Sequence, residues 1–289
     1  VKLLKTSEQA KKCLDSFSLC QPHAAVIDSK MLDLLLQILC KQPKKRITIE
    51  KIAEHDWVEN ALDLAGRGDV DVVVEMIGGS EGVALDLARA TLTAGKSFVT
   101  ANKAMLAHHG AELARLAETN KANLLFEASV AGGIPAVKTL REGLAGNRFN
   151  RVAGILNGTC NYILTTMEQT GRDFAEVLAD AQRLGYAEEE PSFDVDGIDA
   201  AHKLTILAAI AFGQEPDFNA VSICGIRDVS SIDFAYANQL GFRIKLVGVA
   251  EPGLTPHIQP CLLPLDSQLA KVNGVLNAVE YHGEPVGAV

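Results

Sequence analysis

The stretch that decides the fold is residues 70–102, which read VDVVVEMIGGSEGVALDLARATLTAGKSFVTAN. Val70–Ile77 is an almost continuous run of β-branched and apolar residues, which is typical of a strand buried in a parallel sheet. A glycine-rich loop leads from it into a predicted helix over residues 83–94, and Gly95 stands where a helix commonly ends. A second strand is expected over Ser97–Asn102. The order strand, helix, strand predicts an α/β fold.

The alternation continues beyond this stretch. A helix is expected over residues 103–120 and a third strand over Asn123–Val130, which completes a βαβαβ unit of the Rossmann-like kind, truncated to three strands. Ligands of such sheets lie at the carboxyl ends of the strands. The candidate binding loops are therefore residues 77–82, 100–104 and 127–135.

After Pro135 the pattern changes to longer helices and then to mixed strands, which predicts a second, α+β domain. A D-x-x-E cap formed by Asp173 and Glu176 should start one helix, and Gly185 should end it. The expected helices are residues 136–144, 160–169, 174–184 and 198–212, and the expected strands are 152–156, 243–250, 256–264 and 275–283.

Composition limits the classes of function. The chain has 289 residues, 48% of them hydrophobic, with 27 Lys and Arg against 36 Asp and Glu, a net charge of −9. This charge argues against nucleic acid or an anionic membrane as a partner and favours a small molecule. No apolar run reaches the roughly 20 residues that span a bilayer, and no basic-then-apolar leader opens the chain. The six cysteines form no CxxC pair. We expect a reduced, cytoplasmic protein.

The first part of the chain differs from the rest. Residues 1–57 lack glycine and carry ten Lys and Arg against seven Asp and Glu, whereas the remainder carries 17 against 29. Ile27–Val58 resembles the last helices of the C-lobe of a checkpoint-type Ser/Thr kinase. The sequence contains no VAIK, HRD or DFG motif, so kinase activity is not expected. The predicted divisions are residues 1–57, helical and kinase-like, residues 58–135, a partial dinucleotide-binding domain of the Rossmann-like kind, and residues 136–289, the α+β domain.

The densest group of charged residues lies between Gly185 and Lys203, where six acids and one lysine lead into an apolar helix. Asp199 and Lys203 are four residues apart, so they share one helix face. An ordinary structural ion pair and a catalytic pair both fit this spacing. Lys103 follows the second strand directly, at the end where ligands gather, although a solvated lysine is a second reading.

Two other groups are less specific. Glu127 ends the third predicted strand and is followed by two glycines that could turn backbone carbonyls towards a ligand or an ion, or form a plain turn. His108, His109 and His202 lack the spacing of metal ligands, and we expect them to be solvated or structural.

Five ordered blocks of the sequence closely resemble homoserine dehydrogenase, and the match runs from about Trp57 to the C-terminus. The resemblance implies an NAD(P)-dependent oxidoreductase that interconverts L-homoserine and L-aspartate 4-semialdehyde in threonine, methionine and isoleucine biosynthesis, and that forms a homodimer. The blocks are VDVVVEMIGG (70–79), SFVTANKAMLA (97–107), FEASVAGGIPAVKTLREGL (126–144), RVAGILNGTCNYILTTM (151–167) and LGYAEEEPSFDVDGIDAAHKLTIL (184–207).

The same resemblance assigns roles to individual residues. Its implied catalytic residues are Lys203, Lys103 and Asp199, with Lys203 transferring the proton. Its implied substrate ligands are Glu188, Asp194 and Asp199, and its implied cofactor-binding residues are Gly78, Gly79, Ser80, Thr100 and Lys103. A monovalent cation such as sodium would be held by Glu127 and by the carbonyls of Val130, Gly132 and Ile134.

The sequence departs from the family in two places. The G-x-G-x-x-G loop that holds the pyrophosphate of the cofactor is absent, and so is the GRGAG stretch that follows the catalytic domain. We therefore expect weak NAD(P) binding and impaired turnover. The alternative is a non-catalytic dehydrogenase remnant that serves as a dimerisation or scaffold module, and titration with NAD(P) distinguishes the two.

Overall fold

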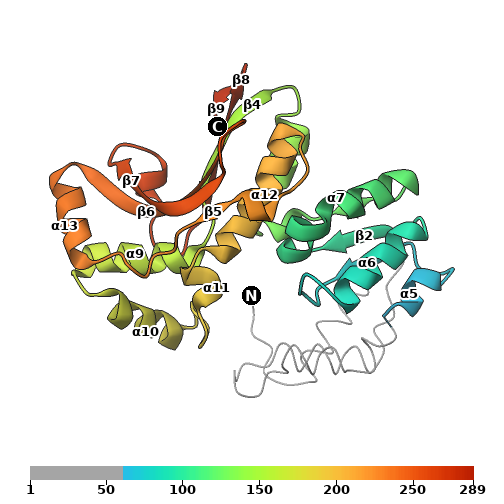
Figure 1. Ribbon diagram of the computed structural model, residues 1–289, viewed down its shortest axis with the longest axis horizontal. Coiled ribbons are helices and arrows are strands. Elements are labelled where there is room, and N and C mark those ends of the chain that lie inside the picture. The colour runs from blue at the N-terminus through green and yellow to red at the C-terminus, as the bar shows by residue number, and fades with distance from the viewer. Residues whose placement is uncertain (1–60) are drawn as a thin grey trace, which may run out of the picture. The chain divides into compact units, whose positions relative to one another are not determined.

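The computed structural model describes residues 61–289 (Figure 1). The kinase-like segment predicted at residues 27–58 lies outside the described residues. The chain divides into two compact units, Val1–Val70 and Asp71–Val289. In the first unit the structure describes the short helix α5 (Asp63–Gly66). Everything below concerns the second unit.

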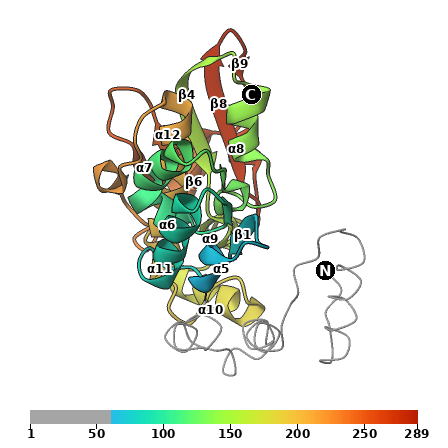
Figure 2. The ribbon, with the colours of Figure 1, turned by 90° about the vertical axis from the view of Figure 1, so that its right-hand side faces the viewer.

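The predicted βαβαβ unit is present. Strands β1 (Val72–Glu75), β2 (Ser97–Thr100) and β3 (Leu124–Leu125) form a parallel sheet in that order. Helices α6 (Val83–Thr93) and α7 (Lys103–Thr119) connect them and pack against each other (Figure 2). Because both connections cross the sheet in the same direction, right-handed crossovers place both helices on one face.

Burial of β1 differs from the prediction. Val73 and Glu75 are buried, but Val72 and Val74 are 51% and 60% exposed. The expectation of a strand buried on both faces was therefore wrong, because the two helices cover only one face of this three-stranded sheet.

The third strand is also shorter than predicted. It ends at Leu125, and Glu127–Ser129 forms a 3₁₀ turn in which the Ser129 amide and hydroxyl both donate to the Phe126 carbonyl. The serine thereby supplies hydrogen bonds to a turn at the position where the strand was expected to continue.

A larger sheet follows, with strand order β5-β7-β6-β4-β8-β9 (Figure 1). Its pairs are antiparallel except for the parallel pair of β5 and β7. The strands are β4 (Arg148–Ile155), β5 (Ser222–Ile223), β6 (Phe242–Ala250), β7 (His257–Pro264), β8 (Ala278–Glu284) and β9 (Gly287–Ala288).

Helices α9, α12 and α13 pack against β6 of this sheet, and α12 is the one that carries candidate site residues. It spans Ile198–Phe212, as predicted, and packs against β4 and β6. Gly154 on β4 pairs with Gly248 on β6 below it. A Cβ atom at Gly154 would lie 2.7 Å from the Ala278 carbonyl oxygen on the neighbouring strand, so the sheet leaves no room for a side chain at this position. The other helices are α8 (Ala136–Lys138), α9 (Gly158–Thr170), α10 (Phe174–Leu184), α11 (Ser192–Val195) and α13 (Ser231–Gln239).

Two helix predictions need correction. The helix expected over residues 136–144 is α8 followed by a π-helical turn at Thr139–Gly143. Asp173 does precede α10, but its side chain makes no capping hydrogen bond, so the D-x-x-E cap is not formed. Gly185 ends α10 in the left-handed conformation, as predicted.

Candidate functional site

The first turns of α12 carry the centre of the site. Asp199 is 5% exposed, and its carboxylate accepts a hydrogen bond of 2.7 Å from the Lys203 ammonium. The same Lys203 Nζ donates to the Leu156 carbonyl at 2.8 Å. The predicted pair therefore shares one helix face, and the carbonyl at the end of β4 fixes the direction of the lysine.

A second ammonium group reaches the same carboxylate. Lys103, the first residue of α7, places its Nζ 3.2 Å from Asp199 Oδ1, and the Nζ also lies 5.5 Å from the centre of the Phe193 ring. The structure thus brings together the three residues predicted to be catalytic, with one buried carboxylate between two lysines.

Asn157 connects this carboxylate to a second one. Its Nδ2 donates to Asp199 Oδ2 at 2.8 Å and to Asp194 Oδ1 at 2.7 Å. Sequence reasoning missed Asn157. The available signal was its place between a strand and a helix, because asparagine at such a position is a common N-cap. Its Oδ1 does accept from the Cys160 amide of α9.

The two carboxylates differ in charge environment. Burial alone would raise the pKa of Asp199, but the ammonium groups of Lys203 and Lys103 outweigh it and hold that pKa below its ordinary value. Burial raises the pKa of Asp194, opposed by the hydrogen bond from Asn157 and assisted by the charge of Asp199. Asp199 is therefore the more firmly ionised of the two.

Glu188, the third predicted substrate ligand, lies at the edge of this group. Its side chain is exposed, and its carbonyl accepts a hydrogen bond from the Gln182 side chain, which also binds the Glu189 carbonyl. The charge of Glu188 contributes to raising the pKa of Asp194, so the two carboxylates are near enough to interact.

The loop predicted to contact the cofactor leaves the carboxyl end of β1. Gly78 and Gly79 are exposed and have φ values of +86° and +84°, which glycine adopts without strain. No neighbouring atom lies within 4 Å of a Cβ built at Gly78. Exposed backbone in an open loop at this end of a parallel sheet suits a dinucleotide, and Ser80 continues the loop.

Glu75 holds this loop in place, and sequence reasoning missed it too. The residue is 1% exposed, and its Oε1 accepts from the amides of Ile77 and Gly78 at 2.6 and 2.8 Å. The Thr100 hydroxyl donates to the other oxygen at 2.6 Å. Asn102 completes the support, since its side chain donates to the Gly79 carbonyl. Thr100 is therefore buried against Glu75, behind the loop.

Two of the four predicted cation ligands, Glu127 and Ile134, already have hydrogen-bond partners within the protein. The two oxygens of the Glu127 carboxylate accept from the amides of Val137 and Lys138, at the start of α8, and the Ile134 carbonyl accepts from the Ala136 amide. Val130 is buried, whereas Gly132 is exposed. Carboxylate and carbonyl oxygens suit a hard cation, but at least two of the four predicted ligand groups accept hydrogen bonds from backbone amides here.

The histidines pack with aromatic rings. His202 is 4% exposed and stacks on Phe218 with ring centres 4.4 Å apart, while the His108 ring meets its edge at 5.4 Å. Burial, assisted by His108 and Lys103, lowers the pKa of His202 to about 4. His109 contacts Glu81 at 2.7 Å. Within residues 61–289, no three His, Cys, Asp or Glu side chains are grouped as metal ligands would be.

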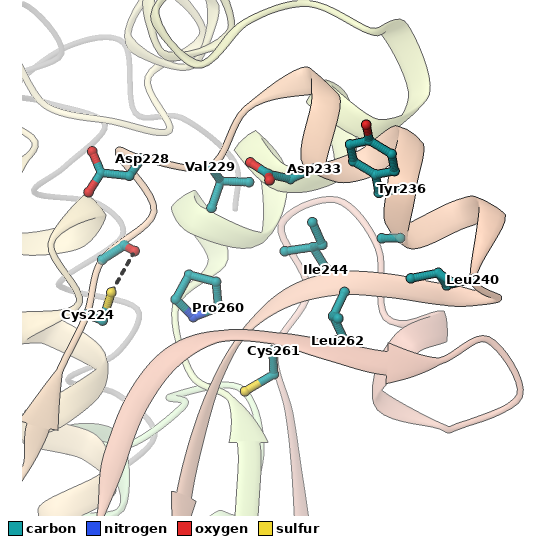
Figure 3. A pocket seen from close by; sticks show the side chains of 12 residues that line it. Cys224, Asp228, Val229, Asp233, Tyr236, Leu240, Ile244, Pro260, Cys261 and Leu262 are labelled. Carbon is teal, nitrogen blue, oxygen red and sulfur yellow. Dashed lines mark hydrogen bonds between the residues drawn. The ribbon is translucent and has the colours of Figure 1, made fainter.

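A cavity of about 360 Å³ lies elsewhere, between α13 and strands β6 and β7. Figure 3 shows Tyr236 of the helix and Leu240, which directly follows it, on one side of the cavity, and Ile244 and Leu262 of the strands on the other. The residues that line it include none of the lysines or carboxylates described above. The carboxylate of Asp233, one of its polar groups, accepts from the Ser230 amide and hydroxyl at the start of α13.

Comparisons with known proteins agree with this arrangement. Two family models match the chain, "Homoserine dehydrogenase" over residues 135–289 and "Homoserine dehydrogenase, NAD binding domain" over residues 23–127. The second match begins within the part of the chain outside the described residues and includes the whole of residues 27–58, the segment that resembles kinase helices.

Individual relatives carry the same name. A homoserine dehydrogenase of Pseudomonas aeruginosa is 51% identical over 230 residues, which is 78% of this chain and 53% of that protein. The crystal structure of a homoserine dehydrogenase from Thiobacillus denitrificans superposes with a TM-score of 0.77 at 46% identity, covering 80% of this chain and 54% of the other. A hyperthermophilic archaeal homoserine dehydrogenase in complex with NADPH gives a TM-score of 0.69 at 31% identity, covering 79% and 67%.

The chain spans about half the length of the curated relatives it matches. None of the helices in the described part of the chain is long and apolar enough to cross a membrane. The family model over residues 135–289, the shared fold of the solved structures and the identities above lead to one conclusion: the chain belongs to the homoserine dehydrogenase family.

Proposed function

We propose that this chain interconverts L-homoserine and L-aspartate 4-semialdehyde with NAD(P), a reaction of threonine, methionine and isoleucine biosynthesis. The observation that carries the proposal is the buried Asp199 carboxylate with Lys203 at 2.7 Å on one side and Lys103 at 3.2 Å on the other. A single carboxylate between two ammonium groups leaves one positive charge in excess. That charge suits a substrate oxygen that becomes negative as the reaction proceeds.

In this proposal the acidic residues hold the amino group of the substrate. Asp194 makes one side-chain hydrogen bond, from Asn157, and its pKa is raised by burial, so a substrate ammonium would replace some of the solvation that the carboxylate lacks. Glu188 lies near enough to interact with Asp194. Together, the carboxylates of Asp194 and Glu188 would make an amino acid bind more tightly than the same molecule without its amino group.

Lys203 is the proposed proton-transfer residue. Its Nζ uses two hydrogen bonds on the Leu156 carbonyl and on Asp199, and an ammonium group has three protons. The third proton is the one that would pass to the aldehyde oxygen during reduction, and the neutral amine would accept it back from the hydroxyl during oxidation. Lys103 would stabilise the same oxygen electrostatically.

NAD(P), when bound, supplies or accepts the hydride. Gly78, Gly79 and Ser80 are proposed to lie against it, since they form an open loop at the carboxyl end of β1. Glu75 and Thr100 would act through this loop by keeping its backbone in place. The NADPH complex of the archaeal relative supports a nicotinamide cofactor for this chain as well.

The test is an assay of NAD(P)⁺ reduction that depends on homoserine. Lys203→Ala should lower kcat by about a hundredfold or more, as expected when the residue that transfers a proton is removed. Lys271→Ala is the matched control, because that lysine is exposed and lies outside the site. Activity unchanged by Lys203→Ala would refute the assigned role.

A binding measurement addresses the proposal as a whole. NAD(P) should bind at millimolar concentration or below in a calorimetric titration of the 289-residue chain. The absence of any binding at that concentration would contradict the proposed oxidoreductase and favour the non-catalytic scaffold.

The remaining features of the proposal come from the family. They are a homodimer in the cytoplasm, and a division into a dinucleotide-binding part near residues 58–135 and a catalytic part near 136–289. The two family matches meet between residues 127 and 135, which supports the second boundary, whereas the NAD-binding match begins at residue 23 rather than at residue 58. The kinase-like origin of residues 27–58 remains a prediction. Light scattering tests the dimer, and limited proteolysis tests the division.

A further inference from the structure

The orientation of the Asn157 side chain is determined by chemistry. The residue is 5% exposed, and its Oδ1 accepts from the Cys160 amide at 2.8 Å. Its Nδ2 faces two carboxylate oxygens, which only accept hydrogen bonds. Rotating the amide by 180° would place an oxygen against two carboxylates and a nitrogen against an N–H group. Only the observed orientation satisfies all three contacts.

We propose that Asn157 is a positioning residue that holds Asp194 and Asp199 as a fixed pair of carboxylates, so that Asp194 stays available as an anion for the substrate ammonium. The last part of this proposal rests on the proposed function, whereas the arrangement of the two carboxylates does not.

The need for such a residue follows from the charges around the pair. Asp199 is compensated by ion pairs with Lys203 and Lys103. Asp194 has no ion pair among the described residues, and the hydrogen bond from Asn157 is the largest influence that favours its ionised form. The charged groups that act on the pair from neighbouring elements are Glu188, which opposes ionisation of Asp194, and the two lysines, of which Lys203 favours it.

A neutral amide is suited to this task. A carboxylate at position 157 would add a third negative charge, and a cation there would neutralise Asp194 before the substrate arrives. The amide donates to both carboxylates and keeps the charge of the site unchanged. Because its oxygen caps α9 at the end of β4, the backbone of the larger sheet fixes its position.

The chain offers a matched pair of variants. Asn157→Ser keeps an N-cap oxygen for the Cys160 amide but is too short to reach the carboxylates. Asn161→Ser is the control, since Asn161 is also buried and lies one turn further along α9. Its side chain donates to the carbonyls of Val272 and Leu276 and accepts from the Lys245 ammonium, and it contacts neither carboxylate of the site. Asn157→Asp is a second test variant that keeps the shape of the side chain.

The measurement is a carbon NMR titration of the aspartate carboxyl groups, combined with calorimetric titration of L-homoserine. Asn157→Ser should raise the pKa of Asp194 and weaken homoserine binding about tenfold, the effect of losing one charge-assisted hydrogen bond. Asn157→Asp should raise that pKa further through the added negative charge. A raised pKa means that Asp194 becomes protonated at a higher pH. As the pH is lowered, each Asn157 variant should therefore lose homoserine binding at a higher pH than the wild type does. Asn161→Ser should leave the titration of Asp194 unchanged.

The results separate this inference from the proposed function. An Asp194 titration that Asn157→Ser leaves in place would overturn the inference, even if activity falls. A shifted titration in a chain that neither binds nor oxidises homoserine would support the carboxylate arrangement and contradict the proposed function. Unfolding in urea identifies any variant that fails to fold. For the variants that fold, the carboxyl signal of Asp194 in the NMR titration decides whether its pKa has changed.

Discussion

Lys245 should make the stability of this protein rise at alkaline pH. Its side chain is fully buried on β6, and its Nζ donates to four oxygens, none of them from a carboxylate. Burial lowers the pKa of Lys245 to about 8, with a smaller contribution from Arg243 in the same direction and one from Glu168 opposing it. The four acceptors are Asn161 Oδ1 at 2.9 Å, Thr165 Oγ1 at 3.2 Å, the Val272 carbonyl at 2.6 Å and Asn273 Oδ1 at 3.2 Å.

The sign and size of the effect follow from proton binding. The pKa is about 8 in the folded chain against 10.5 for an unperturbed lysine, so between these values the unfolded state binds more protons. Stability must then increase with pH across this interval. The difference corresponds to about 3 kcal/mol, which is fully gained only above the unfolded pKa.

The assay compares wild type with Lys245→Met by urea unfolding at intervals from pH 7 to pH 10.5. The difference in unfolding free energy between the two should stay constant up to about pH 8 and then rise in favour of the wild type by about 3 kcal/mol. Lys271→Met, at an exposed lysine, controls for the loss of one positive charge. Parallel stability curves for wild type and Lys245→Met would refute the reasoning.

Three further predictions concern stability. Gly225→Ala should destabilise the chain by about 3 kcal/mol or more, since its Cβ would lie 2.3 Å from the Val195 carbonyl oxygen, and an unchanged urea midpoint would contradict this. Ser230→Ala should cost about 1 kcal/mol in the same assay through loss of the α13 capping box, whereas Ser267→Ala, outside that helix, should cost less. The pKa of His202 falls from 6.5 to about 4, so stability should fall by about 3 kcal/mol as pH drops through this interval; His202→Leu should abolish that fall, and its persistence would refute the assignment.

The local sequence pattern predicted those helices and strands whose limits depend mainly on their own residues. α12 follows its predicted limits because a mostly apolar segment is bounded by Gly197 and Gly213, both in the left-handed conformation that ends a helix. The same reasoning failed for β1, where Val72 and Val74 have the composition of buried residues but lie on the open face of the sheet. Whether a second layer covers that face is decided by the rest of the fold, which a strand's own residues do not encode.

The site divides in a similar way. The contact of Asp199 with Lys203 follows from helical spacing, and the position of Lys103 follows from its place after a strand. Asn157 was missed because the nearer of the two carboxylates it contacts, that of Asp194, is 37 residues away in the sequence. Glu75 was missed because its contact with Thr100 joins residues 25 positions apart. Only the folded chain brings these partners together. A single buried asparagine or glutamate has no periodic pattern by which to recognise it.

The ion pairs of Asp199 also have a mechanical meaning. Lys103 arrives on α7, which belongs to the small parallel sheet, whereas Lys203 and Asp199 belong to the helix packed on the large one. Any relative displacement of α7 and α12 would first stretch the contact between Lys103 and Asp199. The rings of His108 on α7 and His202 on α12 pack together, and His202 also stacks on Phe218. A substitution of any of these three residues would therefore change the distance between Lys103 and Asp199, although none of the three is expected to touch the substrate.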